Sequence, residues 1–427
     1  MLSVLVKRLR RRHGRARPIA AAAVLGLPAL LAVVGPGLLA GLSDDDPAGI
    51  TTYSILGARF GYELLWVVVL ATGALIVFHE LAARMGLVTG KGLVALVRER
   101  FGRVATIAVV SALLVGNVGT TAAEFAGVAA SLDLAGVTRY VSVPVAAVAV
   151  STLVLRGSFH RVEHILLLLG GVFITYIASG FLADPDWGEV AQGLVVPSLP
   201  SEHGSTVVIA ATIGTTLAPW GLAFIQSYAV DKHLHASELR YERIDVITGS
   251  LMTGVIGVFV VIACAATLHA TWQSIDDARD AAVGLEPLAG QLAAALFGVG
   301  LLGAALLAAA VLPLSTAYSL NEALGREAAL DDSFREAPAF YTTYGLVVGV
   351  GAAIVLIPGL PLIGILFVTQ VVNAVLLLPL LVVMILLGRD PEVLGRYRNR
   401  LPGTVLACAA SALVAVSLVA LALSAAA

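Results

Sequence analysis

The chain has 427 residues, of which 59% are hydrophobic and only 13% are charged. Soluble domains carry about 25% charged residues, so this composition excludes an ordinary soluble enzyme and predicts a protein that crosses a membrane several times. The formal net charge of −2 gives no reason to expect nucleic acid as a partner. Cys264 and Cys408 both lie in apolar runs and predict neither a disulfide framework nor a thiolate metal site.

Eleven apolar segments are each long enough, at roughly 20 residues, to cross a bilayer as a helix. The basic run at residues 7–12 is read as a topology anchor. With the N-terminus in the cytoplasm, all but three of the 26 Lys and Arg residues fall on the cytoplasmic side, as the positive-inside rule requires. We therefore expect a multi-pass cell-membrane protein with a cytoplasmic N-terminus and an extracellular C-terminus. The expected spans are residues 26–59 (broken), 63–84, 104–131, 140–156, 162–183, 206–231 (broken), 246–270, 289–322, 341–357, 362–388 and 402–425.

These spans divide the chain into five parts. The parts are a basic cytoplasmic N-terminus (1–25), a first five-helix half (26–183), an extracellular loop (184–204), a second five-helix half (205–388), and a cytoplasmic loop with an eleventh helix (389–427). We expect the extracellular loop to carry a short interfacial helix. A second outer loop, at residues 272–287, is acidic and is expected to be solvated.

The first apolar segment is interrupted by Ser43-Asp44-Asp45-Asp46-Pro47-Ala48-Gly49. Intramembrane carboxylates cost roughly 3 kcal/mol each even on lenient insertion scales, and Pro and Gly break a helix. Asp46 directly precedes Pro47, and this pair is also a common helix start with Asp as the N-cap. At about 100° per residue the three aspartates cannot all face one site. Asp46 is therefore the expected ligand, while Asp44 and Asp45 are expected to line the inner path or to be solvated there.

A second interruption, Gly214-Thr215-Thr216-Leu217-Ala218-Pro219-Trp220, lies in the sixth segment, five spans after the first. Corresponding breaks in two five-helix halves indicate an inverted-repeat transporter with its binding site near the membrane midplane. In the expected topology, both leading half-helices end at their breaks with unpaired carbonyls, which favour cations. An amino-acid carrier would present helix N-termini to the substrate carboxylate, so the acid at Asp46 favours a metal cation.

Four motifs carry a resemblance to a known family. They are Asp46-Pro47-Ala48-Gly49, the linker at residues 82–93, the acid-bearing Thr121-Ala122-Ala123-Glu124, and Thr369-Gln370-Val371. The chain resembles the Nramp family of divalent metal transporters, which usually has Asp-Pro-Gly-Asn, a very similar linker, Asp-x-x-Glu and Ser-Gln-Val at these places. The resemblance covers most of the chain. It implies an all-α polytopic membrane protein with a LeuT-type 5+5 inverted repeat, broken helices 1 and 6, and an eleventh helix.

The departures from the family pattern change the expected chemistry. The family's site Asn in span one falls at Gly49, and its Met-Pro-His in span six becomes Ala218-Pro219-Trp220. Without thioether and imidazole, the remaining oxygen ligands suit Mg²⁺, Mn²⁺ or Ca²⁺. Small residues at 49 and 218 enlarge the site, which fits a Mg²⁺ ion that keeps several waters. The pattern resembles the Nramp-related magnesium transporter branch, which is described as carrying Mg²⁺ and Mn²⁺ without proton coupling.

The hypothesis is a transporter for Mg²⁺, with Mn²⁺ as a second substrate, that works by alternating access and needs no cofactor. The ion and the lipid bilayer are its expected partners. Gln370 would contact the ion directly or through water, and Asn373 is expected to join helices. His79 and Glu80 point about 100° apart and are expected in core or interfacial roles. The expected ion contacts are Asp46, Ser43, Gly49, Thr215, Thr216, Ala218 and Gln370, and the pathway candidates are Asp44, Asp45, Thr121, Glu124 and Asn373.

Proton coupling is left open by a polar stripe of Asn117, Thr120, Thr121 and Glu124 on span three. An intramembrane Glu is a candidate proton relay. The alternative is that Glu124 is protonated and hydrogen-bonded within the bundle, and the sequence is compatible with both. The missing acid at Thr121 and the missing imidazole at Trp220 favour transport without coupling. The alternative is a proton-coupled Mn²⁺ or Fe²⁺ symporter of the ordinary family kind. A channel or an amino-acid carrier of the same architecture is more remote. No His-Glu-x-x-His run is present, and no enzymatic activity is expected.

Overall fold

A computed structural model of the chain describes residues 40–41, 43–155, 171–200, 204–271, 273–276, 278–326 and 334–426. These residues form helices and no strand. Among them, eight helical segments are long and apolar enough to cross a membrane, and two shorter apolar helices accompany them. The predicted all-α, multi-pass architecture is therefore confirmed. The basic run at 7–12 and large parts of the first and fifth predicted spans lie outside the described residues.

The helices follow the predicted order of spans. The first half contains α5 (Pro47–Phe60), α6 (Leu65–Thr89), α7 (Leu93–Asp133), α8 (Arg139–Leu155), η1 (Gly171–Ile174) and α10 (Thr175–Leu182). The short helix predicted in the first outer loop is α11 (Trp187–Val195), and its location at the membrane interface stays a prediction. The second half contains α12 (Ser205–Thr216), α13 (Pro219–Asp231), η2 (Ala236–Glu238), α14 (Leu239–Thr267), η3 (His269–Thr271), α15 (Ala278–Ala282), η4 (Val283–Leu285), α16 (Glu286–Ala289), η5 (Gly290–Leu292), α17 (Ala293–Ala323), α18 (Pro338–Val355) and α19 (Leu362–Arg389). The last elements are α20 (Pro391–Leu394), η6 (Gly395–Tyr397) and α21 (Leu401–Ala426).

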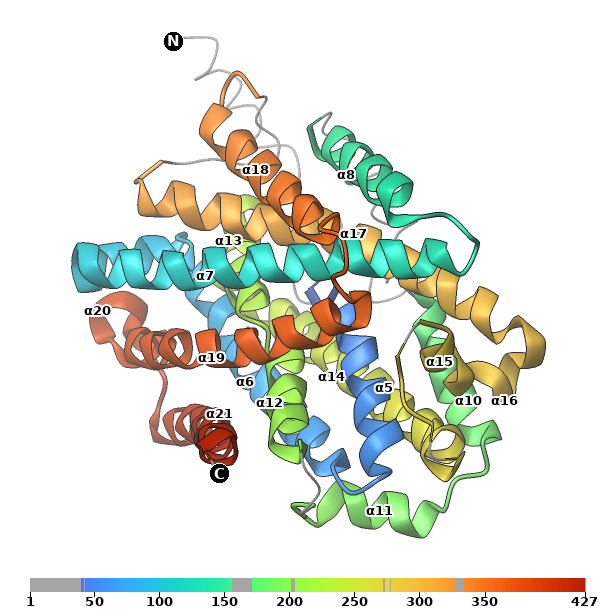
Figure 1. Cartoon of the computed structure of the whole chain (residues 1–427). Coiled ribbons are helices and arrows are strands. Elements are labelled where there is room, and N and C mark those ends of the chain that lie inside the picture. The colour runs from blue at the N-terminus through green and yellow to red at the C-terminus, as the bar shows by residue number, and fades with distance from the viewer. Residues whose placement is uncertain are drawn as a thin grey trace, which may run out of the picture.

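Helices of the first half pack on their counterparts five spans later. The contacting pairs are α5 with α12, α6 with α14, α7 with α17 and α8 with α18. In Figure 1, α7 and α17 run side by side across the molecule, whereas α21 lies at its edge beside α19. This pairing is what two five-helix halves related by a pseudo-twofold axis produce. It places α5 and α12, which carry the two interruptions, against each other.

Both interruptions lie where the sequence predicts them. The chain is helical at Ser43 and Asp44, bends at Asp45 and Asp46, and begins α5 at Pro47. In the sixth span, α12 ends at Thr216 and α13 begins at Pro219. Proline suits the first helical position because its missing N–H has no partner there in any helix. Each interruption therefore ends one half-helix and starts the next within a few residues.

The predicted helix bounds differ from the structure at the linker between spans two and three. α6 continues to Thr89 rather than ending at 84, and Gly90 ends it with a positive φ of 65°. α7 begins at Leu93 rather than at 104, with a kink at Gly102, where φ is 76°. Only the segment after this kink is continuously apolar, so a hydropathy criterion places the start of the helix too late.

The acidic outer loop at 272–287 is not simply solvated as expected. Its described part forms α15 and η4, in which Ala281, Ala282 and Leu285 are buried. These elements pack on α17. The prediction relied on the acidic residues of this loop, which are Asp276, Asp277, Asp280 and Glu286. It overlooked the apolar residues between them.

Glu322, near the end of α17, ties three helices together. One carboxylate oxygen accepts hydrogen bonds from the backbone N–H groups of Val94 (3.0 Å) and Ala95 (3.4 Å) at the start of α7. The other accepts from the Ser227 hydroxyl of α13 at 2.6 Å. The N-cap of α7 is Gly92, which has no side chain to satisfy these N–H groups. Glu322 therefore caps α7 from another helix.

Replacing Glu322 by Ala is expected to destabilise the protein by about 3 kcal/mol, because each buried backbone N–H left without an acceptor costs roughly 1–3 kcal/mol. The unfolding temperature of purified protein in detergent would measure the loss. Glu99→Ala is the control, since Glu99 pairs with Lys91 at the surface and exposed pairs contribute little. Equal unfolding temperatures for the two variants would contradict the capping role.

Candidate metal site

Asp46 lies at the first interruption and caps α5. Its Oδ1 accepts a hydrogen bond from the Gly49 N–H at 2.6 Å, and Pro47 occupies the first helical turn. Asp46 is 4% exposed. The N-cap role that the Asp-Pro pair suggests is therefore observed. An ionised carboxylate has about four acceptor positions, so this cap does not use up the capacity of Asp46 to bind a ligand.

Oxygen atoms converge beside the Cα of Gly49. The position that a Cβ would take there lies 2.9 Å from the Asp44 carbonyl oxygen, 3.3 Å from Asp46 Oδ1 and 3.3 Å from Thr215 Oγ1. Glycine is needed because a side chain would press against all three. The predicted residues Asp46, Gly49 and Thr215 are thus brought together, and the two interruptions share one polar space. The carbonyl that approaches Gly49 is that of Asp44, and a contact of Ser43 with an ion stays a prediction.

The other predicted ligands of the second interruption lie in different surroundings. The Thr216 hydroxyl donates to the Thr212 carbonyl at 2.7 Å and lies 2.8 Å from the Tyr53 hydroxyl. It therefore links α12 to α5. Ala218 has extended backbone as the N-cap of α13, and its carbonyl accepts from the Gly221 N–H at 3.2 Å. Sequence reasoning missed Tyr53, although it follows Asp46 by two helical turns and so shares its face.

Gln370 and Asn373 join α19 to the rest of the site. The Gln370 backbone packs against Gly214 of α12. Asn373 Nδ2 donates to Gln370 Oε1 at 3.1 Å and to Thr120 Oγ1 of α7 at 3.0 Å. Asn373 is thus the interhelical link that the sequence predicts. A direct or water-mediated contact of Gln370 with an ion stays a prediction.

The remaining pathway candidates are buried acids and hydroxyls. Glu124 is fully buried, and its carboxyl group faces that of Asp46. Pro47 packs on Gly127, one turn after Glu124, which brings these two acids together. Asp44 and Asp45 are 2% and 3% exposed and so are buried rather than solvated. The side chains that make no hydrogen bond to any described residue include those of Ser43, Asp44, Asp45 and Thr121.

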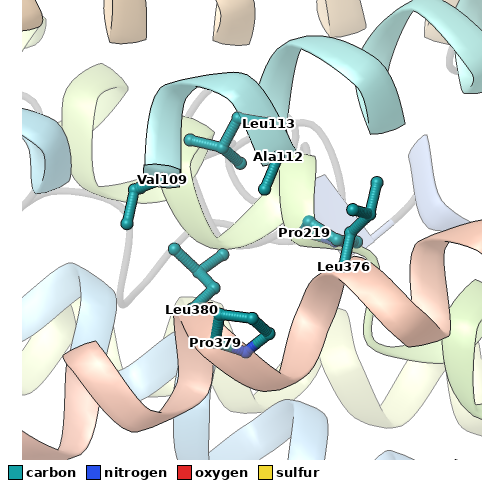
Figure 2. Close-up of a pocket in the computed structure, with 7 residues that line it drawn as sticks. All are labelled: Val109, Ala112, Leu113, Pro219, Leu376, Pro379 and Leu380. Atoms are coloured by element: carbon teal, nitrogen blue, oxygen red, sulfur yellow. The ribbon is translucent and has the colours of Figure 1, made fainter. Parts of the chain in front are cut away.

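The arrangement is an oxygen site and not a cluster of metal-binding side chains. In the described part of the chain, no group of three or more His, Cys, Asp and Glu residues could hold a metal ion. A small pocket beside Pro219 is lined only by apolar side chains of α7, α13 and α19 (Figure 2). That pocket offers no ligand to an ion. A cation near the interruptions would be held by one carboxylate, a hydroxyl, backbone carbonyls and water.

Comparison with known proteins identifies the family of this chain. The profile of the family described as "Natural resistance-associated macrophage protein-like" (Nramp) matches residues 37–424. The chain belongs to the Nramp family. An Nramp relative from Burkholderia ambifaria, named divalent metal cation transporter MntH, is 28% identical over 94% of this chain and 91% of its own length. One from Pectobacterium carotovorum with the same name is 30% identical over 64% of this chain and 68% of its own length. Both are named as transporters, in line with the expectation that this chain is not an enzyme.

Solved structures show the same fold. The manganese transporter of Eremococcus coleocola, in complex with an aromatic bis-isothiourea compound, superposes with a TM-score of 0.73 at 19% identity, covering 91% of this chain and 86% of that one. Mhp1, a nucleobase-cation-symport-1 family transporter, superposes with a TM-score of 0.53 at 17% identity, covering 87% and 81% of the two chains. The LeuT-type fold predicted for this Nramp chain is thereby confirmed.

Proposed function

We propose that this Nramp protein is a membrane transporter for divalent cations, with Mg²⁺ as its main substrate and Mn²⁺ as its second. The names of its relatives support the cation class: two are called divalent metal cation transporters and one structural neighbour a manganese transporter. The preference for Mg²⁺ rests on this chain's own residues.

The convergence of oxygens beside Gly49 carries the proposal. The Asp44 carbonyl, the Asp46 carboxylate and the Thr215 hydroxyl are all hard ligands, which favour Mg²⁺ and Mn²⁺ over softer transition metals. Neither sulfur nor imidazole stands at Ala218-Pro219-Trp220. The missing side chain at Gly49 leaves room for water on the ion, and Mg²⁺ sheds its waters reluctantly. The site would therefore hold a partly hydrated ion.

Transport would occur by alternating access. The two interruptions lie between paired half-helices, and rocking one bundle of helices against the other would open the site to each side in turn. From the distribution of Lys and Arg we infer a cytoplasmic N-terminus and an extracellular C-terminus. The lipid bilayer and the ion are the only partners that the proposal requires.

Uptake by proteoliposomes tests the function. Purified protein in vesicles with a trapped Mg²⁺ indicator should admit Mg²⁺ down its gradient, and protein-free vesicles should not. Uptake that saturates with Mg²⁺ concentration is expected of a carrier with one ion site. Failure of both Mg²⁺ and Mn²⁺ to enter, with folded protein in the vesicles, would contradict the proposed function.

We expect no movement of protons with the ion. A pH indicator inside the same vesicles should report unchanged luminal pH during Mg²⁺ or Mn²⁺ uptake, because Thr121 and Trp220 lack the titratable groups of a relay.

The competing candidate is a proton-coupled Mn²⁺ or Fe²⁺ symporter, which the Glu124 carboxyl group beside Asp46 favours. Luminal acidification during Mn²⁺ uptake that disappears in Glu124→Gln would establish that candidate. Unchanged pH in both proteins would support uncoupled transport.

A further inference from the structure

His79 of α6 is a fully buried histidine whose two ring nitrogens have no hydrogen-bond partner among the described residues. Both carboxylate oxygens of Asp44 also lack a hydrogen-bond partner among the described residues, and Asp44 is 2% exposed. A buried polar group without a partner costs roughly 1–3 kcal/mol. Two such groups close to the substrate site therefore call for a ligand that the protein itself does not supply.

The two side chains face one space, beside Gly221 in the first turn of α13. The position that a Cβ on Gly221 would take lies 3.3 Å from His79 Nε2 and 3.7 Å from Asp44 Oδ1. Glycine leaves this position free. The backbone here is held in place, because the carbonyl of the preceding Trp220 accepts a hydrogen bond from the Ser315 hydroxyl at 3.0 Å. One imidazole nitrogen of α6 and one carboxylate oxygen of the first interruption thus lie within 4 Å of this position.

This space adjoins the site beside Gly49. The carbonyl of Asp44 approaches Gly49, whereas its carboxylate faces His79. Asp44 therefore contributes its carbonyl to one place and its carboxylate to the other. Asp44 belongs to the half-helix that precedes the interruption, so the space lies toward the cytoplasm in the predicted orientation.

We propose that His79 and Asp44 form a second cation station that favours Mn²⁺ over Mg²⁺. Imidazole nitrogen binds transition metals, whereas Mg²⁺ prefers oxygen and water. Two protein ligands and several waters would complete the coordination of a passing Mn²⁺ ion. The station deepens the proposed function, since it assigns the handling of the second substrate to residues outside the oxygen site.

The ratio of Mn²⁺ to Mg²⁺ uptake tests the station in proteoliposomes. His79→Leu is expected to lower this ratio about tenfold, since losing a metal-orienting group typically changes affinity by 10–100-fold. Gly221→Ala should lower it in the same direction by filling the space. His235→Leu, at an exposed position, is the matched histidine control and should keep the wild-type ratio. If His79→Leu fails to fold, Gly221→Ala carries the test, and a wild-type ratio in the folded variant would overturn the proposal.

Binding of Mn²⁺ to purified protein separates this proposal from the proposed function. Loss of the free Mn²⁺ signal in electron paramagnetic resonance would count bound ions without any transport. Asp46→Asn should still bind Mn²⁺ weakly at the second station, and the double variant Asp46→Asn/His79→Leu should bind none. Equal binding by these two variants would overturn the station, even if wild-type protein transports Mg²⁺ as proposed. A water-bridged structural role for His79 predicts that equality.

Discussion

Replacing Asp46 by Asn is expected to lower Mg²⁺ uptake by more than about 100-fold while leaving the fold intact. At an effective dielectric constant of 20, a unit charge 4 Å away is worth about 4 kcal/mol for each charge on the ion. Asn removes this charge but is as good an N-cap as Asp, so α5 should still begin at Pro47. The variant thus separates the ligand role of Asp46 from its capping role, which Asp46→Ala would remove together.

Initial rates of Mg²⁺ uptake into proteoliposomes would measure this effect. Asp186→Asn is the matched control, because Asp186 caps α11 by accepting from the backbone N–H groups of Gly188 and Glu189 outside the bundle. The control should transport like the wild type. Wild-type transport by Asp46→Asn would show that the ion is bound elsewhere.

Adding a single methyl group at Gly49 is expected to lower Mg²⁺ uptake at least about tenfold. The Cβ of Gly49→Ala would lie 2.9 Å from the Asp44 carbonyl oxygen and 3.3 Å from both Asp46 Oδ1 and Thr215 Oγ1. Backbone cannot move away as a flexible side chain does, and overpacking typically costs 1–3 kcal/mol. The methyl group would occupy the space that the three oxygens share and so displace the ion or its water.

Gly345→Ala and Gly73→Ala are the controls for this substitution. Both glycines are helical, and nothing lies within 4 Å of the Cβ position. Alanine there should keep wild-type uptake and add helix stability. Equal uptake by Gly49→Ala and these controls would mean that the oxygens around Gly49 do not hold the ion.

The interruptions could be predicted from the sequence because their causes are local. Asp46-Pro47 and Ala218-Pro219 stop one helix and start another whatever packs around them. The long apolar runs likewise determine most spans without reference to their neighbours. The start of α7 at Leu93 could not be predicted in this way, because its stabilisation comes from Glu322, which lies 228 residues after Val94 in the chain.

The orientation of individual groups within the site depends on packing between helices. The sequence brings Asp46, Gly49 and Thr215 to the interruptions, but it does not tell which carbonyl turns toward Gly49. It also gives no sign that the Thr216 hydroxyl meets Tyr53. His79 was expected in a core or interfacial role, and it is fully buried. The sequence does not indicate that the ring nitrogens of His79 lack partners, or that His79 and Asp44 both lie beside Gly221. Both features depend on how α6 packs against α13.

Metal competition in proteoliposomes tests the account most directly. Mg²⁺ uptake would be followed with a trapped indicator while Mn²⁺ or Ca²⁺ is added outside, in wild-type protein and in Asp46→Asn. We predict saturable Mg²⁺ uptake that Mn²⁺ inhibits and that is lost in Asp46→Asn. The contrary result would be that Mn²⁺ enters the vesicles, whereas Mg²⁺ neither enters nor inhibits Mn²⁺ uptake. That result would contradict a partly hydrated Mg²⁺ site at the interruptions.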